Sequence, residues 1–310
     1  FKPSPNSEVV SQILYGEKFK ILLKRKKYIK IKTHYDNYIG YIKKDKFLKN
    51  FKPSYKISKI KSRIFLKRGK NFLYYNSDGF FQDIAEDYNI DDQYENGRGT
   101  TLSDILYRGR LDIITSNWNG YHRAFVLEDN KFKDIATPTY NIPTRIRTVI
   151  SADFDNDGYD EIFMNNIGEP NKLFKIKENG FFEEIKIQNA YESNGLGTGA
   201  AVADIDEDGI LELLVSHGES GMQPLTMYKA DIKKDFNYIR IKPLNKYGAP
   251  ARGATVIFNS NFRNHAKTID AGSGYLCQME PVAHYGIRDS EKNISVKIVL
   301  TYVSSQLLKI

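Results

Sequence analysis

The 310-residue chain contains a single cysteine, Cys277, so it cannot form a disulfide bond within itself. It also lacks any run of about eighteen apolar residues, the length that a membrane-spanning helix requires, and we expect no membrane span. No phosphate-binding glycine motif occurs, because the glycines of residues 195–199 precede a predicted strand rather than a helix. Intrachain disulfides are thus excluded as a source of stability, and a bound ion is the alternative that we consider.

The scarcity of cysteine and histidine also argues against catalysis. Cys277 lies seven residues before His284 and twelve after His265, so a Cys–His pair is formally available for nucleophilic chemistry. Residues 275–279, however, are predicted to form a strand, in which an unpaired cysteine acts as a small buried apolar side chain. The other three histidines lie in different segments without the spacing of metal ligands. We therefore expect no enzyme activity.

Two acidic loops match each other position for position. Residues 153–161 read Asp-Phe-Asp-Asn-Asp-Gly-Tyr-Asp-Glu (loop 2), and residues 204–212 read Asp-Ile-Asp-Glu-Asp-Gly-Ile-Leu-Glu (loop 3). Each has carboxylates at positions 1, 3, 5 and 9 and a glycine at position 6, where a turn is needed. Such a density of negative charge is typical of a Ca²⁺ site, because calcium accepts several oxygen ligands in flexible geometry.

These loops predict two sets of calcium ligands, each made of four carboxylates and one backbone carbonyl at position 7. The alternative is a solvated acidic turn without metal, which becomes less attractive because two loops share the pattern. The predicted ligands are Asp153, Asp155, Asp157, the Tyr159 carbonyl and Glu161 in loop 2, and Asp204, Asp206, Asp208, the Ile210 carbonyl and Glu212 in loop 3.

An EF-hand is a different kind of calcium loop, with a bidentate glutamate at position 12 between two helices. Position 12 is Met164 after loop 2 and Val215 after loop 3, neither of which binds calcium through its side chain. The flanking segments are short, apolar and β-branched, which favours a strand on each side of the loop. We therefore expect a β-loop-β arrangement.

The loops belong to a repeat of about 50 residues. Residues 104–112 (loop 1) keep Asp104, Gly109 and Asp112 of the pattern, but Leu106 and Arg108 replace two ligands, so we predict the turn without calcium. The segment Phe-Gln-Asp-Ile-Ala at 81–85 recurs in modified form at 132–136 and 182–186, each time after a predicted strand. Short-stranded repeats of this length are typical of β-propeller blades.

On these motifs, residues 71 to about 230 resemble FG-GAP/VCBS repeats, a family of calcium-loop propeller blades. The segments 248–254, 272–276, 278–281 and 284–286 resemble the ASPIC/UnbV domain, which follows such blades in proteins of the cartilage acidic protein type. The resemblance implies an extracellular or periplasmic envelope protein that binds a protein or glycan ligand. Because the chain begins at Phe1, a signal peptide would not be visible in it, and secretion is inferred from the resemblance alone.

The first 70 residues differ chemically from the rest. They hold 21 Lys and Arg against 4 Asp and Glu, whereas residues 71–310 hold 25 against 34. Such asymmetry marks a boundary between modules. Short apolar runs in the first 50 residues predict five strands of a small barrel, and residues 3–5, 14–17 and 38–42 resemble a bacterial SH3 domain of the kind that precedes NlpC/P60 peptidases.

The basic charge has two interpretations: a solvated lysine-rich surface, or attraction to peptidoglycan or another anionic wall polymer. No nucleic-acid motif accompanies it, so we expect no nucleic-acid partner. The predicted organisation is all-β. It comprises an SH3-like barrel at 1–52, a linker or truncated second copy at 53–70, partial propeller blades at 71–232 as an open arc or a small four-bladed ring, and an ASPIC/UnbV-like domain at 233–310.

Overall fold

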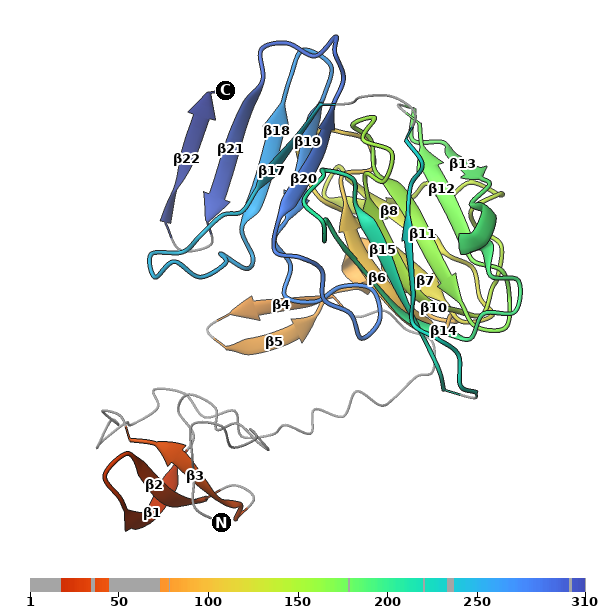
Figure 1. Ribbon diagram of the computed structural model, residues 1–310. Helices are drawn as coiled ribbons and strands as arrows, with labels where there is room; N and C mark the ends of the chain where they lie inside the picture. The colour runs from red at the N-terminus through yellow and green to blue at the C-terminus, as the bar shows by residue number, and fades with distance from the viewer. Residues whose placement is uncertain are drawn as a thin grey trace. The chain divides into compact units, whose positions relative to one another are not determined.

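The computed structural model describes residues 18–34, 37–44, 73–77, 79–177, 179–219, 221–232 and 237–300, together with the backbone of 303–309 (Figure 1). The chain divides into two compact units, Phe1–Ile64 and Phe65–Ile310. Within the described residues there is no helix with the length and apolar character needed to cross a membrane. The prediction of an all-β fold is confirmed, since helical structure in those residues amounts to two short 3₁₀ turns, η1 (Glu86–Tyr88) and η2 (Gln188–Tyr191).

The first unit contains an antiparallel sheet of three strands, β1 (Phe19–Lys24), β2 (Tyr28–Thr33) and β3 (Ile39–Lys43), in the order β1-β2-β3. Alternation places Ile29 and Ile31 of the central strand on its buried face. Arg25, Lys26 and Lys27 form the turn between β1 and β2. In the described part this sheet is open rather than closed into a barrel, and the strands expected before residue 18 lie outside the described residues.

Three sheets of the second unit carry the acidic loops. Each begins with the strand that enters a loop, continues with the strand that leaves it, and adds further antiparallel strands. The first blade contains β6 (Gly97–Ser103), β7 (Asp112–Asn117), β8 (Arg123–Glu128) and β9 (Lys131–Asp134); the second contains β10 (Ile146–Ala152), β11 (Glu161–Asn166), β12 (Lys172–Ile176) and β13 (Phe182–Ile185); the third contains β14 (Gly197–Ala203), β15 (Glu212–His217) and β16 (Thr226–Lys229).

The sheet boundaries are offset from the sequence repeat. The segment 224–228, which follows loop 3 by twelve residues, supplies β16, which pairs with β15 and belongs to the third blade. The hairpin of β4 (Tyr74–Ser77) and β5 (Phe80–Asp83) lies before the first blade in the chain and carries the first copy of the Phe-Gln-Asp segment. It therefore corresponds to the last two strands of a blade.

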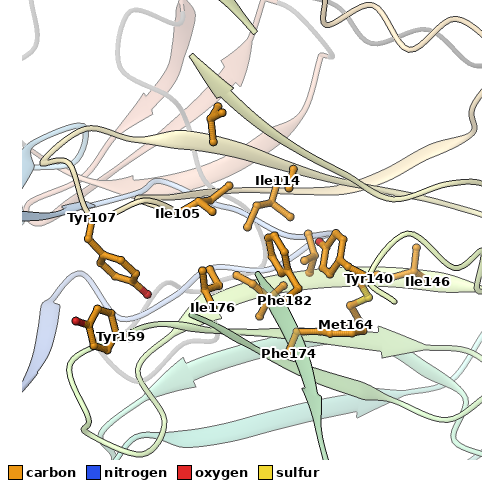
Figure 2. Close-up of a cluster of buried hydrophobic side chains, with 14 residues drawn as sticks. Ile105, Tyr107, Ile114, Tyr140, Ile146, Tyr159, Met164, Phe174, Ile176 and Phe182 are labelled. Carbon is orange, nitrogen blue, oxygen red and sulfur yellow. The ribbon is translucent and has the colours of Figure 1, made fainter. Parts of the chain in front are cut away.

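Successive blades pack face to face through buried apolar side chains. Between the first and second blades, Ile114 and Val126 lie in one cluster with Met164, Phe174 and Phe182 (Figure 2). A second cluster joins the other face of the second blade to the third blade, and a third one joins the segments on either side of the β4–β5 hairpin to the first blade. Burial of both faces of the second blade explains why all six residues of β11 are buried, including the apolar run Ile162, Phe163 and Met164 at its centre.

The C-terminal part forms two further sheets. The strand β17 (Asn237–Ile241) pairs with β20 (Ala283–Ile287), while β19 (Asn264–Thr268), β18 (Thr255–Asn259), β21 (Ser295–Leu300) and β22 (Val303–Lys309) form a four-stranded sheet. Val256, Phe258, Tyr285 and Val296 contribute to the core between them. The Tyr285 hydroxyl donates to the Val256 carbonyl at 2.8 Å, which joins the two sheets inside this core.

The prediction of a strand at residues 275–279 is wrong. The segment contains a turn, with Leu276 in the left-handed region at φ 54° and Gly274 before it at φ 67°. Its partners lie on the first strands of two blades: Gly274 exchanges backbone hydrogen bonds with Thr100, and Cys277 Sγ lies 3.3 Å from the Ala200 nitrogen. The segment therefore lies against the first strands of the first and third blades instead of extending a sheet.

Candidate metal centres

All three loops share one backbone conformation. Positions 4 and 6 have positive φ in each loop: Tyr107 (52°) and Gly109 (75°), Asn156 (57°) and Gly158 (91°), Glu207 (61°) and Gly209 (84°). The aspartate at position 1 accepts the N–H of the glycine at position 6, at 2.7 Å in loop 1, 3.0 Å in loop 2 and 3.1 Å in loop 3. The prediction that loop 1 keeps the turn is thus confirmed, whereas the absence of calcium from it stays a prediction.

In loop 2, each carboxylate uses one oxygen to hold the loop. Asp155 Oδ1 accepts the Asp157 N–H at 3.1 Å, and Glu161 Oε2 accepts the Phe154 N–H at 2.9 Å. One carboxylate oxygen from each of Asp153, Asp155 and Glu161 lies within 4.8 Å of the other two. Strands β10 and β11 hold the two ends of the loop in register, so that position 9 comes back to position 1.

Three buried carboxylate oxygens of loop 2 have no hydrogen-bond donor among the described residues: Asp153 Oδ1, Glu161 Oε1, and Asp160 Oδ1, which lies 2.6 Å from the Lys267 ammonium. Asp153 is fully buried and Glu161 is 1% exposed. Burial raises the pKa of Asp153 to about 7, with Lys267 acting in the opposite direction. Burial also raises the pKa of Glu161 well above its usual range, and the charges of Asp155 and Asp153 add to this effect. Buried carboxylate oxygens without donors are the atoms that a cation would satisfy.

An ammonium group lies on the open side of loop 2. Lys175 Nζ is 2.8 Å from Asp155 Oδ2, 2.5 Å from Asp157 Oδ2 and 3.7 Å from Glu161 Oε1. Burial alone would lower the pKa of Lys175, but its hydrogen bonds with Asp155 and Asp157 outweigh burial and raise it. The negative charges of Asp155, Asp157 and Glu161 therefore favour a cation at the position of this ammonium group.

Loop 3 repeats this geometry on the third blade. Oxygens of Asp204, Asp206 and Glu212 lie within 4.8 Å of one another, and Glu212 Oε2 accepts the Ile205 N–H at 2.7 Å. Asp204 Oδ1 is buried and, among the described residues, has no donor. Lys229 Nζ is 2.8 Å from Asp206 and 2.7 Å from Glu212. Asp206 is more exposed here, at 60% of its side chain, so this centre is more open to solvent than loop 2.

The structure brings together most of the predicted side-chain ligands. Positions 1, 3 and 9 meet in both loops, and position 5, Asp157 or Asp208, reaches the same lysine as positions 3 and 9. Each position-5 aspartate also accepts the N–H of position 7, at 3.0 Å in loop 2 and 2.9 Å in loop 3. The Tyr159 and Ile210 carbonyls stay predictions as ligands.

Loop 1 contains its own cation. The Arg108 guanidinium lies 3.3 Å from the carboxylate of Asp112, which is buried. Arg108 occupies position 5 of the loop, where loops 2 and 3 have an aspartate. Burial raises the pKa of Asp112, and the charge of Arg108 opposes this. A guanidinium thus supplies in loop 1 the positive charge that a metal ion would supply elsewhere.

Comparison with protein families matches these elements to known modules. The FG-GAP-like repeat matches residues 104–164 and 153–215, which contain all three loops. The ASPIC and UnbV model matches residues 245–305, and the bacterial dipeptidyl-peptidase Sh3 domain matches residues 2–47. The chain carries FG-GAP-like repeats and an ASPIC and UnbV domain, preceded by a bacterial SH3 domain.

The chain is similar to curated proteins named cartilage acidic protein 1. It is 45% identical over 239 residues to that of Xenopus tropicalis, which spans 73% of the chain and 37% of the relative. It is 42% identical over 245 residues to those of Homo sapiens and Mus musculus, which spans 74% of the chain and 37% or 38% of the relative. The chain therefore spans well under half the length of these relatives.

Strands of the C-terminal part, two of them within the ASPIC and UnbV match, contact the first aspartate of all three loops. Asp104 Oδ2 accepts the N–H of Ala266 on β19 at 3.0 Å, and Asp153 Oδ2 accepts that of Gly286 on β20 at 2.9 Å. Asp204 Oδ2 lies 3.2 Å from the guanidinium of Arg240 on β17. Reasoning from loop spacing did not find these contacts, because they join residues that lie far apart in the chain.

Other C-terminal side chains surround loop 2. The Arg288 guanidinium lies over the Tyr159 ring at 4.2 Å and donates to the Asp157 carbonyl at 2.7 Å. His284 Nε2 is 2.6 Å from Asn156 Oδ1. Asp160, which was not predicted as a ligand, pairs with Lys267 at 2.6 Å; burial alone would raise its pKa, but Lys267 and His265 lower it well below its usual range.

The alternative catalytic pair is not assembled around Cys277. Its sulfur lies near the Tyr275 carbonyl at 2.7 Å and the Thr148 hydroxyl at 3.6 Å. His265 instead lies against Asp160 and Arg263, and His284 against Asn156. Both histidines thus contact residues of loop 2 instead of Cys277.

Proposed function

We propose that the chain is a non-enzymatic, calcium-binding module of the cell exterior or envelope that binds a protein or glycan ligand. The observation that carries the proposal is the pair of loops in which carboxylate oxygens converge within 4.8 Å, while buried aspartate oxygens at position 1 have no donor in the described part of the chain. The donor set consists only of oxygens, which suits calcium better than zinc or copper.

Calcium would be held by the same positions in both loops. Positions 1, 3, 5 and 9 supply carboxylates and position 7 supplies a carbonyl, as predicted from the sequence. The ion supplies the positive charge that offsets these buried carboxylates. The chain's own part is to orient them: the position-6 glycine holds position 1, and the strands on each side fix position 9.

Isothermal titration with calcium tests this proposal directly. We expect two equivalents for the unmodified chain and one for each of the single variants Asp155→Ala and Asp206→Ala. Glu207→Gln is a matched control, because Glu207 is an exposed acidic residue at position 4 of loop 3. Unchanged stoichiometry in both aspartate variants would contradict the assignment.

Location outside the cytosol is part of the proposal. Extracellular calcium-binding modules work at dissociation constants of about 10⁻⁴–10⁻³ M, a range that suits loops partly open to solvent. The FG-GAP repeats and the similarity to cartilage acidic protein 1 support this placement. A titration that gave dissociation constants near the nanomolar range of cytosolic buffers would count against it.

A second candidate function is attachment to a bacterial cell wall through the N-terminal unit. The match to a bacterial SH3 domain favours it, together with the basic turn between β1 and β2. We expect the full chain to sediment with cell walls at low salt, and substitution of Lys24, Arg25, Lys26 and Lys27 by glutamine to weaken this. Equal sedimentation of the unmodified chain and the glutamine variant would show that the basic turn is only a solvated surface and does not contribute to wall binding.

A further inference from the structure

Each complete acidic loop has a lysine directly opposite its last carboxylate. Glu161 of loop 2 pairs across the sheet with Lys175 of β12, and Glu212 of loop 3 pairs with Lys229 of β16. Each ammonium contacts the carboxylates at loop positions 3, 5 and 9. The same arrangement in two different sheets indicates that the lysine is part of the centre rather than a chance surface pair.

Loop 1 provides the comparison. Its cation, Arg108, belongs to the loop itself. On the neighbouring strand, Phe125 pairs with Ile113, so the next position, beside Asp112, is the fully buried Val126. A cross-strand lysine is therefore present beside both loops that lack an internal cation and absent beside the loop that has one.

We infer that Lys175 and Lys229 are built-in cations that hold loops 2 and 3 in the absence of calcium. Each ammonium group must leave its loop before calcium can bind there. This inference rests on the proposed calcium function. Calcium binding is then an exchange of an ammonium group for a metal ion. The lysines lower the affinity for calcium and keep the metal-free loops folded.

The contacts of the first aspartates explain why the exchange can favour calcium. The ammonium contacts three of the four carboxylates but leaves Asp153 Oδ1 and Asp204 Oδ1 without a donor among the described residues. A divalent ion with six to eight oxygen ligands can satisfy all four at once. The two cations exclude each other, because both need the same oxygens and repel at short distance. The displaced lysine can place its ammonium in water while its stem stays on the sheet.

The two centres differ in how easily the lysine can leave. The side chain of Lys175 is 19% exposed and contacts Asp157, itself 20% exposed, whereas Lys229 is 29% exposed beside Asp206 at 60%. Lys175 therefore has the more enclosed position. We expect its removal to change calcium affinity more than removal of Lys229.

Calcium titration of the full chain and its Lys175→Met and Lys229→Met variants tests the inference. Methionine keeps an unbranched side chain without the charge. We expect each variant to bind calcium at one site about tenfold or more tightly, since a charge-assisted competitor is removed. Lys172→Met is the control: Lys172 lies on the same strand as Lys175 with the same 19% exposure, but pairs with Glu184 on the surface.

The outcomes separate the inference from the proposed function. Two calcium ions bound with equal affinity by the unmodified chain and both lysine variants would overturn the inference and leave the proposed function intact. No calcium bound by any of these proteins would overturn both. Calcium bound by the lysine variants but not by the unmodified chain would overturn both the exchange and the proposed function, because the lysines would then replace the metal permanently.

A second measurement needs no variant. Lysines of the unmodified chain are acetylated with a small reagent, in calcium or in chelator, and the modified peptides are quantified by mass spectrometry. We expect calcium to increase modification of Lys175 and Lys229 at least severalfold and to leave that of Lys172 unchanged. Equal modification of all three lysines in calcium and chelator would contradict displacement.

Discussion

At the scale of the residue, sequence spacing identified the carboxylates but not their partners. Asp153, Asp155 and Glu161 could be predicted because a nine-residue loop with a glycine at position 6 fixes which side chains converge. Lys175 could not, since it lies fourteen residues beyond Glu161 and meets it only through strand pairing. Cross-strand partners depend on the register, which the loop pattern alone does not define.

Among single residues, His122 makes stability depend on pH. It is fully buried in the first blade, where Nδ1 accepts the Asn117 N–H at 3.2 Å and Nε2 lies 3.1 Å from the Thr144 hydroxyl. Burial lowers the pKa of His122 to about 4 from the ordinary 6.5, and Lys172 acts in the same direction. The folded protein thus binds this proton less readily than the unfolded chain.

The stabilising contribution of neutral His122 is therefore complete above pH 6.5 and is lost as the pH falls from 6.5 toward 4. From the shift in pKa, we expect a loss of about 2 kcal/mol at pH 5 from this residue. The measurement is urea unfolding at pH 7 and pH 5 for the unmodified chain and His122→Gln. An equal pH dependence in both proteins would contradict the assignment.

At the scale of the element, the backbone turn of a loop forms independently of the carboxylates that would bind the metal. Loop 1 has the same left-handed positions as the complete loops, although Leu106 and Arg108 replace two carboxylates. The glycine pattern was therefore sufficient to predict a turn. Local pattern failed at residues 275–279, where apolar residues suggested a strand but glycines at 272 and 274 and contacts with β6 and β14 impose a turn.

The shared backbone predicts that calcium binding can be restored to loop 1. In the double variant Leu106→Asp/Arg108→Asp, positions 1, 3, 5 and 9 would again carry carboxylates on an existing turn. We expect one additional calcium equivalent by titration, together with lower stability in chelator because Leu106 packs against the apolar cluster between blades. A folded double variant with unchanged stoichiometry would show that the backbone alone does not define the site.

At the scale of the whole molecule, the family modules could be predicted from the sequence, whereas their contacts could not. Composition and repeats indicate blades and a C-terminal β domain, and each is present in the described residues. The contact between Asp153 and Gly286 joins residues 133 apart, and no local pattern records it. Long-range packing of this kind is decided by shape and by the hydrogen bonds of specific backbone groups.

This packing predicts a large effect of one methyl group. A Cβ on Gly286 would lie 2.3 Å from the backbone of Asn156, so Gly286→Ala must separate β20 from loop 2. We expect a loss of about 1–3 kcal/mol in stability, as in other overpacked sites, and weaker calcium binding at loop 2. Gly221→Ala is the control, since its Cβ would meet only the flexible end of Leu196, at 3.0 Å. Equal unfolding midpoints for the two variants would contradict the close contact.

The central claim is that two FG-GAP loops bind calcium in the folded protein, and a thermal melt of the full chain in calcium and in chelator tests it most directly. A ligand that prefers the native state stabilises it by mass action, by about 2.7 kcal/mol at a concentration one hundred times the dissociation constant. We predict that calcium raises the melting temperature, with a smaller increase in Asp155→Ala and Asp206→Ala. Superimposable cooperative melts in calcium and chelator would contradict the claim and identify the loops as acidic turns without metal.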